Sequence, residues 1–476
     1  MPARDFSTYF LYRWRYVIGY TMVGLLLAGL LLFAGLYLPG ALSQSEVSAT
    51  VTSASLSLKH PETLAVANLP FYLLQAGILK LFGVTLFAIK LPALILGLFS
   101  AIGFILLLRR WFKPNIAVLA SLIAISTGQF LFIAQSGTAS ILYIFWPITL
   151  LLLGTQVTRT KRFRFIWKLL FAMTAALSLY TPLSIYPIIA IILAIILHPH
   201  LRAILRRLSK ARLTVVAIVF ALLVTPLVYF TIKTPSLGIT LLGIPTSWPV
   251  DLVGNIITLL KQYFLFWQPG NTTVMTPVFG LGSALLIVLG LYRLVRTRDT
   301  TRSYLIIIWL ICLTPVLLLN PSFTSVTFVP SVLMLAAGLT SLISYWYRLF
   351  PRNPYARVSG LIPIIVLVVV LIVTGLARYV YGYHYSPTIA PLFSKDLALL
   401  PKNTKELVVG DDEKPFYQAV AKYRPSLTVT DVPTGAEFTA THEARKDMPG
   451  YTVERIIVSA RTADADRFYV YQKTAK

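Results

Sequence analysis

Long apolar runs, separated by short polar and basic stretches, dominate the first 380 residues of the chain. A helix needs about 20 apolar residues to cross a hydrocarbon core of about 30 Å. By this measure the runs predict eleven transmembrane helices, at approximately 17–38, 86–108, 115–134, 140–157, 166–181, 183–198, 213–232, 277–292, 303–319, 326–345 and 360–380. We therefore expect residues 1–380 to form an all-α, polytopic membrane domain.

Two segments between these helices, 39–85 and 233–276, contain apolar runs that are too short to span a membrane. Examples are LPFYLLQAGILKLFG at 69–83 and VGNIITLLKQYFLFW at 253–267. Short amphipathic helices of this kind usually lie in the plane of the membrane interface. We expect the two segments together to roof a cavity at one leaflet.

The pattern changes after residue 380 to that of an ordinary soluble domain. Alternating and β-branched residues predict strands at 405–410, 426–432, 453–459 and 467–472, and helical patterns predict helices at 414–423 and 439–446. Strands mixed with helices favour a small α/β domain. The predicted division is thus a membrane domain at 1–380 and an α/β domain at 381–476.

Composition agrees with a membrane protein. Hydrophobic residues make up 57% of the chain and charged residues 12%, about half the charged share of a typical soluble domain. The net charge is +25, but residues 1–380 hold 29 basic and 5 acidic residues, whereas residues 381–476 hold 13 and 12. Because the excess lies in short loops between apolar runs, it indicates membrane orientation and not a nucleic-acid partner.

The positions of the basic residues predict which side each loop occupies. With the N-terminus inside the cell, 23 of the 29 basic residues of this part fall on the cytoplasmic side, near 109–114, 158–165, 199–212, 293–302 and 346–359. Cytoplasmic loops are the ones enriched in Lys and Arg. The protein is therefore predicted to be a multi-pass cell-membrane protein whose C-terminal domain, after an odd number of spans, is extracytoplasmic.

Acidic residues are scarce in the membrane part, and those outside the cell attract attention. Glu46, Glu62 and Asp251 are the acids predicted to lie there. A carboxylate held at the membrane surface can act as a general base, taking a proton from an acceptor hydroxyl during sugar transfer. The alternative for Glu46 is a solvated interfacial acid, and the alternative for Asp251 is a cap on the helix that begins near Leu252.

Several short motifs follow one another between Leu38 and Gly154: SE at 45–46, NLPFY at 68–72, LKLFG at 79–83, KLPAL at 90–94, RRWF at 109–112 and AQSGT at 134–138. Their order resembles that of the family C integral membrane glycosyltransferases, of the protein O-mannosyltransferase and aminoarabinose-transferase type. The family has Asp-Glu, His-Pro-Pro-Leu-Tyr, Leu-Phe-Gly, Arg-Leu-Pro-Ser and Ala-Arg at comparable places. FY at 416–417 and RP at 424–425 are similar to the soluble tails of some bacterial members.

The resemblance implies an enzyme like a bacterial dolichyl-phosphate-mannose-protein mannosyltransferase. Its donor would be a polyprenyl-phosphate-linked sugar, and its acceptor a protein, lipid or glycan outside the cell. No cofactor is implied, and no Gly-rich phosphate loop lies between a predicted strand and a predicted helix. The expected partners are thus membrane lipids, the lipid-linked sugar and the acceptor.

This sequence departs from the family pattern at charged positions. Ser45 stands where the family has its leading Asp, so that Glu46, the second acid, becomes the catalytic candidate. Gln135 stands near the expected Arg, and SVTFVP at 325–330 replaces an Arg-Tyr-Leu motif. Lys90 and Arg378, at outer helix ends, are then the candidates for binding the donor phosphate, with snorkelling to lipid headgroups as the alternative.

Further residues are expected near the substrate. His60 and Glu62 can orient a substrate hydroxyl or share a proton, although an exposed loop histidine is the commoner case. The resemblance adds Asn68, Tyr72 and Gln135 to the substrate-binding set.

No metal site is predicted. Cys312 is the one cysteine, which excludes disulfides and thiolate clusters, and HPH at 198–200 has no carboxylate nearby in the sequence.

The main hypothesis is therefore an outward-facing glycosyltransferase that uses a lipid-phosphate sugar, with Glu46 at its centre. The alternative is a catalytically degenerate relative that binds a lipid-linked glycan or a partner protein, which the loss of the leading Asp at Ser45 favours. A transporter ranks third, because the sequence has no internal repeat and its acids lie at the predicted surface.

Overall fold

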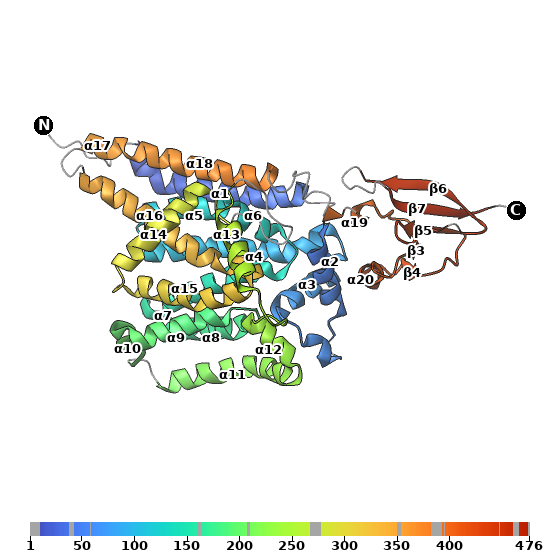
Figure 1. The fold of residues 1–476 in the computed structure, drawn as a ribbon, viewed down its shortest axis with the longest axis horizontal. Helices are drawn as coiled ribbons and strands as arrows, with labels where there is room; N and C mark the ends of the chain where they lie inside the picture. The colour runs from blue at the N-terminus through green and yellow to red at the C-terminus, as the bar shows by residue number, and fades with distance from the viewer. Residues whose placement is uncertain are drawn as a thin grey trace.

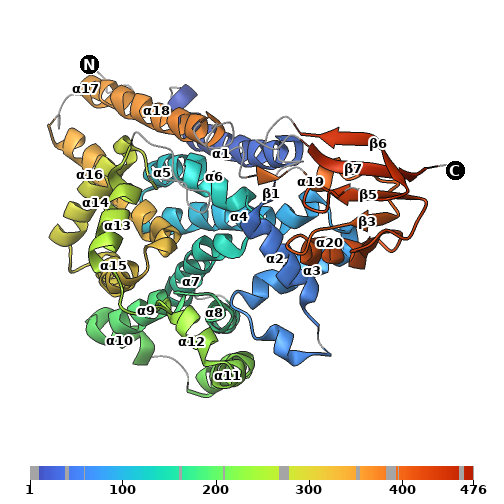
Figure 2. The same ribbon diagram turned by 45° about the vertical axis from the view of Figure 1, so that its right-hand side comes forward.

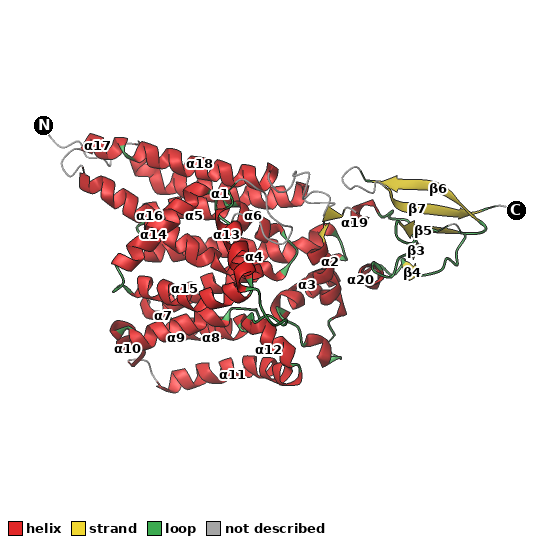
Figure 3. Cartoon of the chain, viewed as in Figure 1, coloured by secondary structure: helices red, strands yellow, loops and turns green. Residues whose placement is uncertain are grey.

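The computed structural model describes residues 10–37, 42–57, 59–159, 163–206, 210–266, 278–349, 354–381, 393–394, 396–446, 448–459 and 466–474. Nearly all regular structure up to Tyr379 is helical, and most strands lie in the C-terminal part, as Figure 3 shows. The predicted change from helical to mixed structure therefore occurs close to the expected place.

The helices of the membrane part follow one another along the chain with short connections. They are α1 (Phe10–Tyr37), α2 (Gln44–Ser55), η2 (Pro61–Leu64), α3 (Leu69–Phe82), α4 (Leu86–Trp111), α5 (Pro114–Ser126), α6 (Gly128–Gln135), η3 (Ala139–Ile141), α7 (Leu142–Arg159), α8 (Arg164–Ser178), α9 (Ile185–Leu197), α10 (Pro199–Arg206), α11 (Lys210–Lys233), α12 (Pro235–Leu242), α13 (Leu252–Phe264), α14 (Leu281–Arg296), α15 (Thr301–Leu319), η4 (Pro321–Thr327), α16 (Phe328–Leu349), α17 (Pro354–Ser359) and α18 (Leu361–Tyr379).

Within the described residues, six helices are long and apolar enough to cross a membrane, and a bent pair makes a seventh. The six are Leu86–Trp111, Ala139–Arg159, Ala211–Lys233, Thr301–Leu319, Pro321–Leu349 and Leu361–Tyr379. Most of the exposed side chains on α11 and α18 are apolar, which suits contact with lipid. The chain is therefore a multi-pass membrane protein.

The predicted total of eleven spans is not confirmed. Helices occupy the predicted runs at 166–181, 183–198 and 277–292, but α8, α9 and α14 have only 15, 13 and 16 residues. These are shorter than the roughly 20 residues that a perpendicular span requires. Between α8 and α9 the chain turns at Pro182, which shortens both helices relative to the apolar pattern.

The run predicted at 115–134 is a broken helix. α5 and α6 meet at Thr127 with a bend of 59°, and the hydroxyl of Thr127 caps α6 by accepting a hydrogen bond from the backbone N–H of Phe130. α18 passes close to the break at Gly375, where a Cβ atom would lie 2.3 Å from the carbonyl oxygen of Ser126. Only glycine allows this approach without a shift of the backbone.

The two segments predicted to lie outside the cell form short helices, as expected. α2 and α3 come from the first segment and α12 and α13 from the second. α2 and α3 lie at the end of the helical part that carries the C-terminal strands, and α10 and α17 lie at the opposite end (Figures 1 and 2). Asp251 caps α13 by accepting a hydrogen bond from Gly254 N–H at 2.9 Å, which confirms the capping interpretation.

The C-terminal part contains a five-stranded sheet in the order β4-β3-β5-β7-β6. β3 is parallel to β4 and β5, whereas β7 is antiparallel to β5 and β6. The bounds are β3 (Glu406–Val408), β4 (Thr428–Thr430), β5 (Glu437–Thr441), β6 (Tyr451–Val458) and β7 (Asp466–Lys473), with the helices α19 (Asp396–Leu399) and α20 (Lys414–Tyr423).

The helix predicted at 439–446 is wrong, because β5 occupies the start of this segment. Phe438, Thr439, Ala440 and Thr441 are buried in the middle of the sheet, with neighbours on both sides. Tertiary pairing with β3 and β7 therefore overrides the local helical pattern. The other predicted strands and the helix at 414–423 are confirmed.

Two contacts join the C-terminal part to the segment at 39–85, which follows α1. β1 (Leu42–Ser43) pairs in antiparallel fashion with β2 (Phe393–Ser394). α20 packs on α2, and the ammonium of Lys422 donates a hydrogen bond to the carbonyl of Ala54. The segment that follows the first helix is thereby held beneath the C-terminal part.

Candidate functional site

Glu46 lies in the first turn of α2, where it closes a capping box with Ser43. The backbone N–H and the hydroxyl of Ser43 donate hydrogen bonds to Glu46 Oε2 at 2.8 Å and 3.0 Å. In return, Glu46 N–H donates to Ser43 Oγ. Such a box satisfies backbone donors that the first helical turn leaves free, so the local sequence SQSE already explains why Glu46 occurs here.

The second carboxylate oxygen of Glu46 reaches two groups from other parts of the chain. Lys90 Nζ lies 2.8 Å from Oε1, and the backbone N–H of Gly137 donates to the same oxygen at 2.6 Å. The Glu46 and Lys90 side chains are only 1% and 6% exposed. The structure therefore brings together two residues that the sequence had singled out, as a buried ion pair.

Gly137 is needed for this contact. A Cβ atom at this position would lie 2.8 Å and 2.9 Å from atoms of Ile89 and 3.2 Å from Glu46 Oε1. The backbone N–H can approach the carboxylate because glycine has no side chain. The loop that links α6 to η3 thus supplies a hydrogen-bond donor in the manner of an anion site.

Gln75 is a residue of this site that the sequence analysis missed. Its side chain is fully buried, accepts a hydrogen bond from Ser53 at 2.6 Å, and donates to the carbonyls of Ile89 at 3.0 Å and Gly137 at 3.2 Å. These contacts join α2, α3, α4 and the loop at 137. A single amide inside the apolar run at 69–83 was the available signal, because a buried amide must find partners.

Gln135 is linked to the ion pair through Tyr379, and Arg378 precedes Tyr379 in the last turn of α18. The hydroxyl of Tyr379 donates to Gln135 Oε1, and Tyr379 is close enough to Glu46 to interact electrostatically with it. Within the described part of the chain, Gln135 Nε2 and Arg378 Nη2 are buried and make no hydrogen bond. Gln135 therefore has an unused donor near Glu46, and Arg378 has another in the last turn of α18.

His60 and Glu62 pair with each other and not with Glu46. His60 Nδ1 lies 3.1 Å from Glu62 Oε1, and both side chains are about two-thirds exposed, at 69% and 70%. Glu62 lies close enough to Lys233, at the end of α11, to interact with it electrostatically. Their substrate-binding roles stay predictions.

Asn68 and Tyr72 occupy the start of α3. Asn68 takes a left-handed conformation at φ 61° before the helix, and its N–H donates to the carbonyl of Tyr180. Its Oδ1 is buried without a hydrogen-bond partner in the described residues. Tyr72 packs against Phe71, with ring centroids 5.9 Å apart. Within the described part of the chain, neither residue forms a hydrogen bond or ion pair with Glu46, and their substrate-binding roles stay predictions.

No metal centre is found in the ranges that the structure describes, since no three His, Cys, Asp or Glu side chains come together there. The chemistry available around Glu46 is instead that of a carboxylate, an ammonium, an amide and a backbone N–H. Such groups can bind a phosphate and accept a proton.

Comparison with known proteins gives a family and a fold. Residues 59–230 match the family described as dolichyl-phosphate-mannose-protein mannosyltransferase, a range that includes Lys90, Gln135 and Gly137. A search of curated protein sequences found no match.

Solved structures of ArnT from Cupriavidus metallidurans have a similar fold. The apo form is 13% identical with a TM-score of 0.52, and the match covers 95% of this chain and 98% of that one. The form bound to undecaprenyl phosphate is 12% identical with a TM-score of 0.52, and covers 94% and 97%. The resemblance to the family C integral membrane glycosyltransferases is thereby confirmed: this chain has their fold, and residues 59–230 match their mannosyltransferase family.

Proposed function

We propose that the protein is a membrane glycosyltransferase that moves a sugar from a polyprenyl-phosphate donor to an extracytoplasmic acceptor. Residues 59–230 match a family that is named for its donor, dolichyl-phosphate-mannose, a sugar linked to a lipid phosphate. One solved structure of similar fold holds undecaprenyl phosphate. The observation that carries the proposal is the buried Glu46–Lys90 pair, which lies with Gln135 at the end of the helices where α2 and α3 gather.

Lys90 binds the donor phosphate in this proposal. A buried ammonium is stable only with an anion beside it, and in the structure that anion is Glu46 at 2.8 Å. A phosphate that enters the site replaces the carboxylate as the partner of Lys90. The unused donors of Gln135 and Arg378 are suited to contact further phosphate oxygens.

Exchange of partners prepares Glu46 for catalysis. In the structure both of its oxygens are occupied, by Ser43, Lys90 and Gly137. Once Lys90 has turned to the phosphate, Oε1 takes the proton of an acceptor hydroxyl. The acceptor oxygen then forms a bond with the anomeric carbon, the bond from that carbon to the phosphate oxygen breaks, and polyprenyl phosphate leaves bound to Lys90.

The test is consumption of radiolabelled donors in membranes that contain the protein. Hexosyl- and pentosyl-phosphoryl-undecaprenol are supplied, and release of undecaprenyl phosphate is measured. We expect Glu46→Gln to lower the rate by about 100-fold or more, as for loss of a general base. The matched control is Glu454→Gln, which removes an exposed carboxylate from the C-terminal sheet and leaves the rate unchanged.

Undiminished turnover by Glu46→Gln would show that this residue is not the general base, but the proposal that the protein is a transferase would still stand. If the wild-type protein consumed none of these donors, the transferase proposal itself would fail.

One observation favours the alternative, a catalytically degenerate relative that binds a lipid-linked glycan or a partner. All contacts of the Glu46 carboxylate are within the protein, as in a structural ion pair. This alternative predicts that Glu46→Gln and Lys90→Met change stability but that no donor is turned over. Binding of undecaprenyl phosphate without turnover would support it.

A further inference from the structure

A cavity of about 760 Å³ lies on one face of the C-terminal sheet, between β6 and the loop that follows β5. Its volume is within the range of sites for small ligands, about 300–1,000 Å³. The opposite face of the sheet packs inward, because Phe468 and Ile457 join a cluster with Leu42 and Ile78 of the membrane part. The cavity therefore lies on the face that is turned away from this contact.

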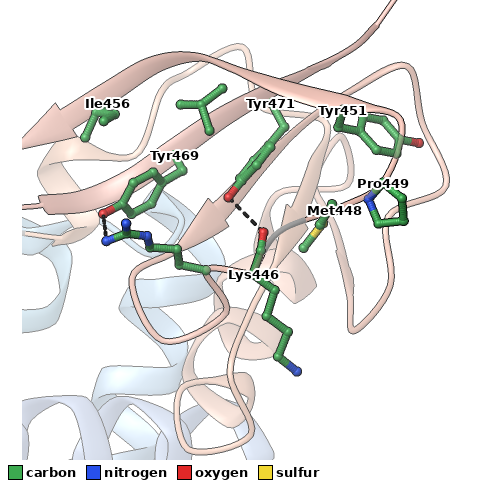
Figure 4. Close-up of a pocket in the computed structure, with 9 residues that line it drawn as sticks. Lys446, Met448, Pro449, Tyr451, Ile456, Tyr469 and Tyr471 are labelled. Atoms are coloured by element: carbon green, nitrogen blue, oxygen red, sulfur yellow. Dashed lines mark hydrogen bonds between the residues drawn. The ribbon is translucent and has the colours of Figure 1, made fainter.

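Three tyrosines line the cavity, and the hydroxyl of each donates a hydrogen bond to another group of the protein. Tyr451 donates to the carbonyl of Gly435 at 2.9 Å, and Tyr469 donates to Asp466 at 2.7 Å. Tyr471 donates to the carbonyl of Lys446 at 3.3 Å (Figure 4). Tyr469 and Tyr471 are only 2% and 4% exposed and form the floor of the cavity, whereas Tyr451 is partly exposed. The phenolic oxygens have lone pairs that accept hydrogen bonds.

The ionised side chains in the described lining are both cations, Arg445 and Lys446. Arg445 stacks over the ring of Tyr469 at 5.1 Å and donates one hydrogen bond to its hydroxyl at 3.1 Å. A guanidinium has five N–H groups, so most of the Arg445 donors remain for a ligand, since the described residues supply this one hydrogen bond. The side chain of Lys446 is exposed, and Figure 4 shows its amine extending away from the sheet. A negatively charged ligand suits this wall.

A β-bulge in β6 adds the apolar wall. Val453 pairs with Tyr471, and Ile456 pairs with Tyr469, because the register shifts by one residue at Glu454. Val453 and Ile456 consequently lie on the same face as the tyrosines although they are three positions apart. They are 45% and 46% exposed, which leaves them available to a ligand.

The same bulge argues against an extended peptide as the occupant. β6 is an edge strand of the sheet, and a peptide would add to it by backbone hydrogen bonds. A bulge and charged side chains interrupt such pairing, and β6 carries both at Glu454 and Arg455. A ligand that uses side chains in the cavity is favoured over one that uses the strand edge.

We propose that this cavity binds an anionic saccharide. The C–H face of a pyranose ring packs on the exposed Val453 and Ile456 and on the edge of Tyr451, its hydroxyls donate to the phenolic oxygens, and its carboxylate pairs with Arg445. The C-terminal part would then hold an acidic glycan beside the membrane. This binding does not depend on the transferase activity of the helical part.

The experiment uses the full chain in nanodiscs of neutral lipid, with trigalacturonate as the probe and no polyprenyl donor. Calorimetry measures affinity, and saturation-transfer NMR detects contact with the sugar C–H protons. We expect trigalacturonate to bind at least about tenfold more tightly than its uncharged methyl ester, a difference typical of one charge-assisted hydrogen bond.

Variants distinguish the cavity from general surface charge. Arg445→Gln should weaken binding about tenfold, and Ile456→Asp, which places a carboxylate in the cavity, should abolish it. The matched control is Arg455→Gln, which removes the same charge from the residue that pairs with Val470, on the other face of β6, and should leave affinity unchanged. Circular dichroism and thermal unfolding establish that each variant is folded.

Three results would overturn the proposal. These are equal binding of the acid and its ester, equal weakening by Arg455→Gln and Arg445→Gln, and absence of trigalacturonate binding at millimolar concentration. Triglutamate serves as the comparison for peptides. Tighter binding of triglutamate than of trigalacturonate would assign the site to an acidic peptide instead.

Discussion

Two opposite charges, Glu46 and Lys90, are buried together at the end of the helices that faces the C-terminal sheet. Removing a charge from water is unfavourable, and the attraction between partners offsets that penalty only when the geometry is good and other hydrogen bonds are present. Ser43 and Gly137 provide those hydrogen bonds. The pair therefore tolerates burial but depends on both members.

Removal of one member should destabilise the protein strongly. We expect Lys90→Met to lower the free energy of unfolding by about 3–5 kcal/mol, because it leaves the Glu46 carboxylate buried without its cation. Thermal unfolding in detergent, followed by tryptophan fluorescence, measures the change. Lys80→Met is the matched control, since Lys80 is exposed at the end of α3 and its loss should have little effect.

A double variant separates the charge effect from packing. Lys90→Met with Glu46→Gln removes both charges and should unfold at a higher temperature than Lys90→Met alone. Equal stability of Lys90→Met and Lys80→Met would show that the ion pair contributes nothing to the fold.

At the scale of elements, α20 begins with an unusual acid. Glu413 precedes the helix, makes no side-chain capping bond, and has an Oε2 that is buried without a hydrogen-bond partner in the described residues. The pKa of Glu413 is raised to about 7, chiefly by burial and also by the nearby Glu443 and Asp396 carboxylates, against the opposing effects of the Thr441 hydrogen bond and the Arg467 charge. The protonated form is thus favoured in the folded state.

The pKa of Glu413 predicts a pH dependence for α20. Because the pKa is higher in the folded state than the ordinary 4.5, the stabilisation from this group is complete below pH 4.5 and is lost as pH rises through about 7. Hydrogen exchange of the α20 amides, compared between wild type and Glu413→Gln at the same pH, measures the effect. We expect the variant to protect α20 more than wild type does at pH 8, and similar protection at pH 5.

Comparison at equal pH removes the intrinsic pH dependence of exchange. The same difference between the two proteins at pH 5 and pH 8 would contradict a titration of Glu413 in this range.

At the scale of the whole molecule, the structure separates two ends of the helical part. α2, α3 and the C-terminal sheet share one end, and α10 and α17 share the other (Figure 1). The basic connections of the sequence belong to the second end, so the positive-inside rule predicts that this end is cytoplasmic. The first end, with Glu46, then faces outward.

Labelling of single cysteines tests this orientation. In a Cys312→Ser background, Asp412→Cys and Arg298→Cys place one thiol at each end, at residues that are exposed in the structure. A membrane-impermeant maleimide should label Asp412→Cys in sealed right-side-out vesicles and Arg298→Cys only after permeabilisation. The reverse pattern would place the proposed site in the cytoplasm.

The sequence by itself determined that the first 380 residues form an apolar, helical membrane part, where most helices and strands lie, and that Glu46 and Lys90 are candidate site residues. Hydrophobic runs, alternation and scarce charges are local properties, and the physical preferences that they express do not require a partner elsewhere in the chain. Even so, the apolar pattern overestimated the length of α9, which has 13 residues where a run of 16 was predicted, because the pattern does not register the turn at Pro182.

Only the tertiary structure decided which residues that are distant in the sequence come into contact. It paired Glu46 with Lys90 and Gly137, placed Gln75 between α2 and α4, and made a strand of the segment at Thr439. Each of these outcomes depends on burial against residues far away in the sequence. An ion pair, a buried amide or a central strand is stabilised by its neighbours in space, and those neighbours are fixed only when the whole chain has folded.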